Sequence, residues 1–143
     1  MLRREDVLDQ LDGVFGRFGR LTRKPWAKAM ELTFGQYALL KHLYLQGRMT
    51  MGDLANELDI TMAGATGMVD RLLQVGLVER YRSEQDRRLV HVDLSAKGRQ
   101  KIQQLQETRQ QYIRSLLIPL SDDELVTLHD LLSRVAEAGE KTQ

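Results

Sequence analysis

Long amphipathic segments occur at both ends of this chain. Over residues 7–21 the apolar positions recur at spacings of four and three, which places them along one stripe of a helix. A second helical stripe belongs to a helix that begins at Ser95 and continues until Pro119, and a third covers residues 125–135 of a helix opened by the capping box Ser121–Glu124. The pattern predicts one long helix near the start of the chain and two at its end.

The middle of the chain carries shorter helical patterns separated by turn signals. Thr33 is placed to cap a helix that Gly47 closes, and Thr50 begins a short helix with a Thr-x-x-Asp box. Thr61 caps a further helix over residues 61–75 after a short turn. Two helices of this length joined by so short a turn indicate a helix-turn-helix.

A β-ribbon is expected directly after these helices. Residues 77–82 are rich in strand formers, residues 83–88 are polar enough for a loop tip, and Val90, Val92 and Leu94 alternate with polar neighbours as in a half-buried strand. A charged loop between two strands, placed after a helix-turn-helix, is typical of the wing of a winged helix.

These elements predict a mainly α (α+β) fold, a winged helix-turn-helix whose N- and C-terminal helices form a dimerisation bundle. The chain is long enough for one compact domain. Within it we expect residues 31–95 to form the DNA-binding region, and residues 1–30 with 96–143 to form the helical dimerisation region.

The terminal helices also predict the oligomeric state. Their apolar stripes are too long to be buried on a small central winged region, and packing against the same helices of a second copy would cover them. We therefore expect a homodimer. The alternative is a monomer that folds its own helices into a bundle.

The helix over residues 61–75 is the candidate recognition helix, because an α-helix fits the major groove of DNA and reads base edges with its first turns. Those turns carry small side chains, namely Thr61, Met62, Ala63, Ala65 and Thr66. The two threonines can form hydrogen bonds, and Met62 and Ala65 can touch thymine methyl groups. Arg71 lies a full two turns into the helix, where we expect a phosphate contact or an ion pair with Asp70 or Glu79. Direct reading of bases should therefore be weak.

The candidate wing supplies the cations that the helix lacks. Residues 71–101 hold eight basic and four acidic residues, and Arg82, Arg87 and Arg88 can reach a minor groove or its walls. Asp86 is placed to hold the Arg88 guanidinium through a paired hydrogen bond. The plainer interpretation of Asp86 and Arg88 is a surface ion pair in a turn.

Three motifs together resemble the signature of the multiple-antibiotic-resistance-regulator (MarR) family. They are Asp86-x-Arg88, then Val92-x-Leu94-Ser95-x-x-Gly98, and upstream Leu72-x-x-x-Gly-Leu-Val-x-Arg80. Leu32-Thr33 and the closing helix pair agree with the same pattern. The resemblance covers nearly the whole chain.

The resemblance implies a dimeric winged-helix transcription factor, usually a repressor, that binds a pseudo-palindromic operator and is often released by small aromatic or phenolic ligands. It makes Arg88 the minor-groove arginine, Asp86 its orienting partner and residues 61–71 the recognition helix. Many members have an arginine where this chain has Gly67, which puts base specificity in question more than DNA binding itself.

Several other kinds of chemistry find no support. The chain has no cysteine, and His42, His91 and His129 fall in separate predicted elements, so we expect no metal site and no cofactor. No phosphate loop or nucleophile motif appears, so we do not expect an enzyme. The chain has no long apolar run and the N-terminus lacks the apolar stretch of a signal peptide, which favours a cytoplasmic protein without membrane contact.

A small-molecule site is expected where the first helix meets the second. Arg20, Trp26, Tyr37 and His42 could line a pocket for a small aromatic effector that carries negative charge. The alternative is that Trp26 and Tyr37 are packing residues and the neighbouring cations a solvated face.

Two rival functions remain open at this level. One is a winged helix that docks a protein instead of DNA, and the other is a small-molecule-binding protein without affinity for double-stranded DNA. Salt separates the first rival from a DNA-binding protein, because binding through several phosphates weakens steeply with ionic strength.

Overall fold

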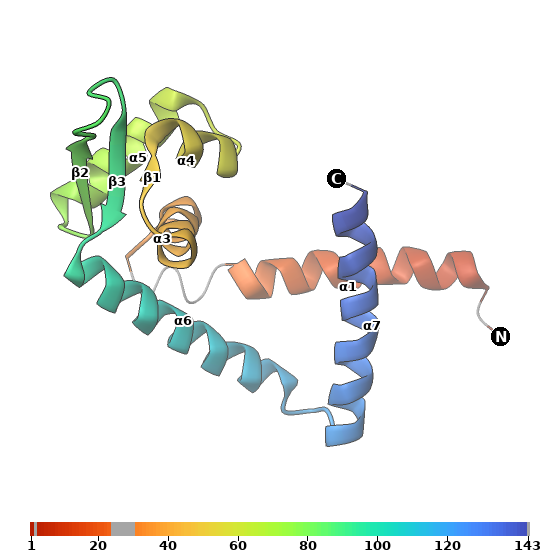
Figure 1. The fold of residues 1–143 in the computed structure, drawn as a ribbon. Helices are drawn as coiled ribbons and strands as arrows, with labels where there is room; N and C mark the ends of the chain where they lie inside the picture. The colour runs from red at the N-terminus through yellow and green to blue at the C-terminus, as the bar shows by residue number, and fades with distance from the viewer. Residues whose placement is uncertain (2, 24–30, 143) are drawn as a thin grey trace. The chain divides into compact units, whose positions relative to one another are not determined.

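A computed structural model of the protein describes residues 1, 3–23 and 31–142, which form two compact units, Met1–Thr108 and Arg109–Gln143. The first unit begins with helix α1 (Arg4–Arg23), and the second consists of the last turns of α6 (Ala96–Leu117) and helix α7 (Asp122–Lys141). Figure 1 labels the elements in the order in which they occur along the chain.

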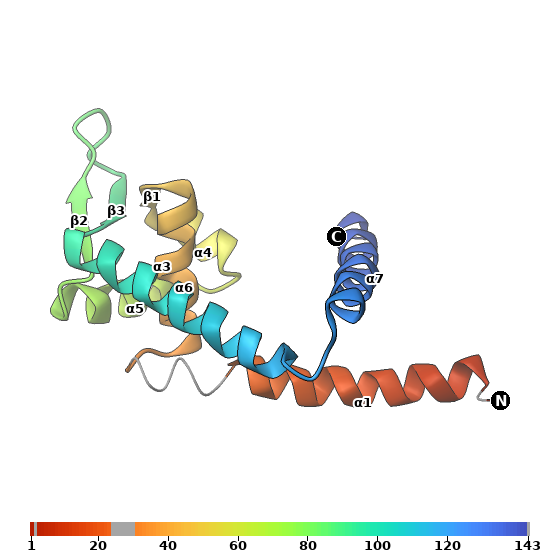
Figure 2. The ribbon, with the colours of Figure 1, turned by 90° about the horizontal axis from the view of Figure 1, so that it is seen from below.

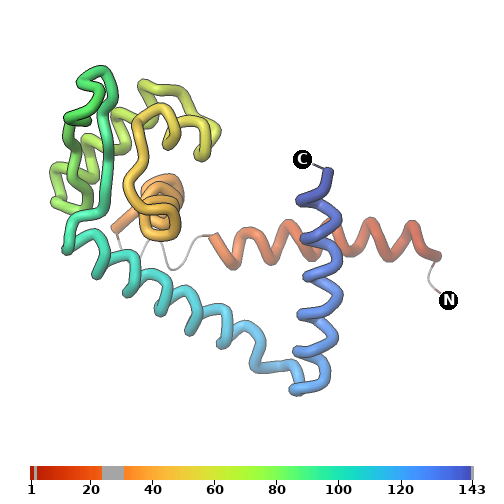
Figure 3. The backbone as a smooth tube through the Cα atoms, viewed as in Figure 1, coloured from red at the N-terminus to blue at the C-terminus, as the bar shows by residue number. Residues whose placement is uncertain are grey.

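Residues 33–108 form a winged core, a term used below for this segment alone. It contains α3 (Phe34–Gln46), β1 (Met49–Thr50), α4 (Met51–Glu57) and α5 (Met62–Gln74), which Figure 3 traces in this order. The strands β2 (Val78–Arg82) and β3 (Val90–Leu94) follow, and then the first turns of α6. The predicted winged helix-turn-helix is confirmed.

The three strands form an antiparallel sheet in the order β1-β3-β2. Arg80 pairs with Val92 and Arg82 with Val90 across β2 and β3, whereas β1 contributes only Met49 and Thr50. Figure 2 shows the loop between β2 and β3 standing out from α3, α4 and α5. The sequence did not predict β1, because two residues are too few to show an alternating pattern.

Side-chain caps begin the helices of the winged core at the predicted positions. Thr33, Thr50 and Thr61 each accept a hydrogen bond from the backbone N–H three residues on, which satisfies a donor that the first turn leaves unpaired. Gly47 and Gly76 follow α3 and α5 with φ of 80° and 75°, a conformation that glycine adopts without steric cost.

Apolar side chains from every helix of the winged core and from β3 meet in one interior. The fully buried ones include Leu39, Leu40 and Leu43 of α3, Leu54 of α4, Val69 and Leu72 of α5, Val92 of β3, and Ile102 and Leu105 of α6. The first turns of α6 thus contribute side chains to the same interior as α3, α4, α5 and β3. The predicted division into a DNA-binding and a dimerisation region stays a prediction.

Neither α1 nor α7 has a buried residue within a single chain. Large apolar side chains of both helices are exposed, among them Leu8, Phe15 and Phe18 in α1 and Val126, Leu132 and Val135 in α7. A search of the described residues found no helix long and apolar enough to cross a membrane.

Candidate nucleic-acid interface

Helix α5 divides its residues between the core and the solvent. Ala65, Val69 and Leu72 are fully buried at helical spacing, whereas Met62 is 54% exposed and Ala63, Thr66 and Arg71 are also exposed. The prediction that Ala65 touches a thymine methyl group is therefore wrong, because its methyl group packs in the interior.

Near the start of α5, several positions on the exposed face have small side chains or none. The Thr61 hydroxyl accepts a hydrogen bond from the Gly64 N–H at 3.0 Å, so this threonine is engaged in capping the helix. A Cβ built at Gly67 would meet no atom within 4 Å, so this position opens directly to solvent. A partner could therefore approach the α5 backbone closely here.

Asp70 of α5 forms its ion pair with Arg80 of β2, with 2.7 Å between Oδ1 and Nη1. We expected Asp70 or Glu79 as partners for Arg71, and among the described residues neither carboxylate lies within ion-pairing distance of it. A phosphate contact stays the prediction for Arg71. Sequence reasoning missed Arg80, although its spacing of two from the buried Val78 and from Arg82 indicated one shared face of the strand.

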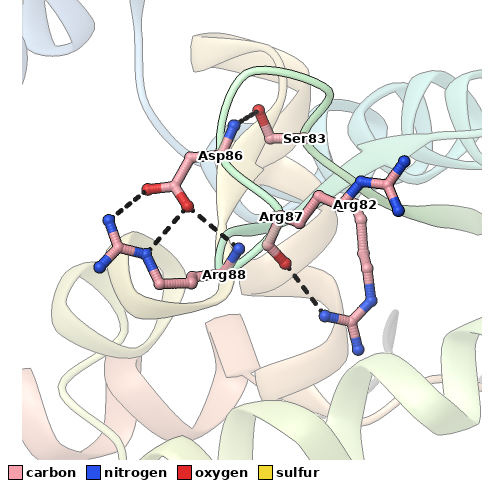
Figure 4. A network of polar contacts seen from close by, with 5 residues as sticks. All are labelled: Arg82, Ser83, Asp86, Arg87 and Arg88. Carbon is pink, nitrogen blue, oxygen red and sulfur yellow. Dashed lines mark hydrogen bonds and ion pairs between the residues drawn. The ribbon is translucent and has the colours of Figure 1, made fainter.

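The loop between β2 and β3 is closed by its own hydrogen bonds. The Ser83 and Leu89 amides donate to Leu89 and Asp86 carbonyls respectively, each at 3.0 Å, and the buried Ser83 hydroxyl accepts from the Asp86 N–H. Figure 4 shows this loop with the side chains of Ser83, Asp86, Arg87 and Arg88, and that of Arg82 at the end of β2. An ordered loop loses less conformational entropy on binding a partner.

Asp86 and Arg88 form the predicted paired hydrogen bond at the loop tip. Arg88 donates from Nε to Oδ1 at 3.0 Å and from Nη2 to Oδ2 at 3.1 Å, and its backbone N–H also donates to Oδ1 (Figure 4). These bonds, the side-chain ones foremost, lower the pKa of Asp86 below its usual range. The Arg88 side chain is nevertheless 91% exposed, so the two hydrogen bonds to Asp86 orient the guanidinium and leave it accessible to a partner.

Arg82 is ordered in a different way. Its Nη1 donates to the Arg87 carbonyl at 3.0 Å, and within the described part of the chain no carboxylate pairs with it (Figure 4). Because a carbonyl carries no formal charge, this contact does not offset the positive charge of Arg82 at the base of the loop. The loop thus carries three exposed arginines, Arg82 at its base and Arg87 and Arg88 nearer its tip, and their contact with DNA stays a prediction.

Some of the residues predicted to line a small-molecule site can be placed. Tyr37 is only 4% exposed, which favours the packing interpretation of this residue. His42 is half-buried on α3, with Nδ1 2.8 Å from the Ala38 carbonyl and Nε2 3.9 Å from the Glu57 carboxylate. Arg20 is exposed on α1, and Trp26 lies outside the described residues. The site stays a prediction.

No group of three or more potential metal ligands was found in the described part of the chain.

Comparison with known proteins points to one family. A model of the MarR family matches residues 32–90. The HTH-type transcriptional regulator YsmB of Bacillus subtilis, itself described as uncharacterized, is 31% identical over 104 residues, 73% of this chain and 71% of that protein. The HTH-type transcriptional repressor MdtR of the same organism is 25% identical over 109 residues, 76% of this chain and 70% of that protein.

Solved structures agree with the sequence matches. A MarR family protein from Bacillus stearothermophilus superimposes with a TM-score of 0.84 at 26% identity, over 99% of this chain and all of the other. NadR, solved in complex with 4-hydroxyphenylacetate, superimposes with a TM-score of 0.64 at 26% identity, over 87% of this chain and 89% of that one.

Proposed function

Because this chain belongs to the MarR family of DNA-binding transcriptional regulators, we propose that it is a homodimeric repressor that binds a pseudo-palindromic operator. The observation that carries the proposal is the Arg88 side chain, held by Asp86 at the tip of the ordered loop and exposed over nine-tenths of its surface. An arginine ordered in this way is suited to a minor groove.

Each winged core contacts two adjacent grooves in this proposal. The first turns of α5 enter the major groove with Thr66, Met62 and Ala63, and the loop tip places Arg88 in the neighbouring minor groove. Because α5 offers few long polar side chains, base contacts contribute little there, and the shape of the minor groove contributes much of the sequence preference.

The exposed apolar stripes of α1 and α7 support the homodimer. Two copies that pack these helices together would cover side chains that a single chain leaves in water. The recognition helices of such a dimer would lie about 34–36 Å apart, one turn of B-form DNA, which matches two half-sites of a pseudo-palindrome.

Repression follows from occupancy of the operator, since a dimer that covers promoter DNA blocks other proteins without any further contact. The relative MdtR is named as a repressor, which supports the same direction of regulation. The relatives named above are transcriptional regulators, not enzymes. A phenolic or other small aromatic acid is proposed as the effector, supported by the ligand bound to NadR.

A selection from random duplex DNA tests the proposal. Purified protein should enrich a two-fold symmetric site, and its affinity for that site should fall steeply as salt is raised. Titration with 4-hydroxyphenylacetate and related aromatic acids should then release the DNA, and an affinity that stays unchanged across the series would contradict the proposed effector. Protein that retains no duplex in dilute buffer would contradict DNA binding, and enrichment of a site without symmetry would contradict the dimer.

A further inference from the structure

A groove of about 730 Å³ lies between α5 and the β-ribbon of the winged core. Met62 and Thr66 line its helix side, and Arg80, Arg82 and Arg88 line its ribbon side. None of the described residues that line it is acidic. The groove is therefore positively charged along one wall and suited to a negatively charged occupant.

Arg80 is placed in this groove by the strand and oriented by the helix. Val78, Arg80 and Arg82 share one face of β2, and Val78 is buried, so the two arginines extend from the edge of the core toward α5. The bond from Nη1 to Asp70 uses one of the five N–H donors of the guanidinium. The side chain remains 39% exposed, so other donors are accessible from the groove.

The geometry of B-form DNA indicates which part of a bound duplex would occupy the groove between α5 and the β-ribbon. Its major and minor grooves are separated by a single sugar–phosphate strand, so a protein that inserts a helix into one and a loop into the next must accommodate that strand between them. On the basis of the proposed function, we propose that this groove seats the separating strand, that Arg80 contacts one of its phosphates, and that Asp70 is the positioning residue for Arg80.

The same ion pair also couples the two DNA-contacting elements. Asp70 belongs to α5 and Arg80 to β2, so their bond ties the recognition helix to the ribbon that carries the loop tip. A phosphate bound beside Arg80 would meet a guanidinium that is already ordered, which reduces the entropy lost on binding.

Salt dependence separates a phosphate contact from a purely structural role. Arg80→Gln should weaken the binding of selected and unrelated duplexes to a similar extent, by roughly tenfold or more. The plot of log binding constant against log salt concentration has a negative slope, and the variant should reduce the magnitude of this slope by about one per protomer, or about two for a homodimer. Arg99→Gln removes the same charge from α6, outside the groove, and should leave that slope unchanged. Arg80→Lys keeps the charge and should nearly restore the slope.

Asp70→Asn tests the positioning role. It should weaken binding less than Arg80→Gln does and should leave the salt slope at the wild-type value, because the phosphate contact remains. If Asp70→Asn tightens binding instead, Asp70 does not position Arg80. If Arg80→Gln does not fold, the double variant D70N/R80Q, which leaves no unpaired carboxylate, provides the same slope measurement.

The phosphate contact is overturned if Arg80→Gln and Asp70→Asn weaken binding alike and neither changes the slope, since the ion pair would then serve only to hold α5 against β2. A wild-type protein that binds no duplex would overturn the proposed function itself, whereas steep salt dependence with an unchanged Arg80→Gln slope would overturn this inference alone.

Discussion

At the scale of single residues, the loop tip shows how one carboxylate can orient a cation. Asp86 accepts three hydrogen bonds from Arg88, and these lower its pKa. Because the pKa of Asp86 is lowered, its carboxyl group is ionised and paired with Arg88 at any pH above the ordinary aspartate pKa of about 4. The pair is lost only as the pH falls through the lowered pKa. DNA binding should therefore not change with the titration of Asp86 between about pH 5.5 and 8.

Asp86→Asn should weaken operator binding even though it removes a negative charge. Without the carboxylate, the Arg88 side chain must be ordered at the moment of binding, so we expect a loss of affinity that is smaller than the roughly 1–3 kcal/mol expected for Arg88→Ala. Fluorescence anisotropy with the selected duplex at fixed salt measures both losses.

Glu84→Gln is the matched control for this prediction, because Glu84 lies in the same loop and its replacement removes the same charge. We expect its affinity to be equal to or slightly tighter than wild type. Equal affinities for the Asp86→Asn and Glu84→Gln variants would mean that the Asp86–Arg88 pair is only a surface ion pair.

At the scale of elements, the junction of β2 and α6 depends on a close backbone approach. A Cβ built at Gly98 would overlap the Leu77 carbonyl oxygen and lie 2.8 Å from its carbonyl carbon. Ser95 secures the junction, since its hydroxyl accepts from the Gly98 N–H at 2.9 Å and its backbone N–H donates to the Leu77 carbonyl at 3.1 Å. Only glycine lets α6 begin this close to the ribbon.

Gly98→Ala should destabilise the winged core by about 3 kcal/mol or more, because the added methyl group meets backbone that no side-chain rotation can move away. Gly67→Ala is the contrasting variant, since its Cβ enters open space in mid-helix and should stabilise the protein by about 0.5–1 kcal/mol. Thermal and urea unfolding measure both changes. A Gly98→Ala variant as stable as wild type would show that α6 and β2 can separate freely.

At the scale of the whole molecule, the terminal helices leave apolar surface that the chain alone does not cover. Leu128 is half-buried and Leu132 is 42% exposed on the stripe of α7. An exposed stripe along a complete helix is typical of a protein interface. In the proposed dimer it also sets operator affinity, because two linked winged cores bind two half-sites more tightly than one core binds either.

Replacing Leu128 and Leu132 together by glutamate should shift the protein from dimer to monomer and weaken operator binding by tenfold or more through the lost bivalency. Sedimentation velocity measures the first effect and anisotropy the second. Leu45→Glu is the control, since Leu45 is 66% exposed on α3 and lies outside the stripe. A monomeric variant that binds the operator as tightly as wild type would contradict the link between dimerisation and affinity.

The local features of the fold were predictable because they depend on residues close together in sequence. Capping by Thr33 and Thr61 and the ribbon around Asp86 follow from patterns that span a few residues. Ala65 was misassigned because a small apolar residue suits both an interior and a DNA-facing position, and only the packing of α5 on the core distinguishes them.

Apart from β1, the sequence alone determined the order of the helices and strands, the caps that begin the helices of the winged core, and the Asp86–Arg88 pair at the loop tip, since periodicity, caps and a two-residue spacing act locally. Tertiary structure decided that Asp70 pairs with Arg80 rather than Arg71, and that Gly98 lies against Leu77. These contacts join residues from different elements, and their geometry follows from how those elements pack, which no local pattern specifies.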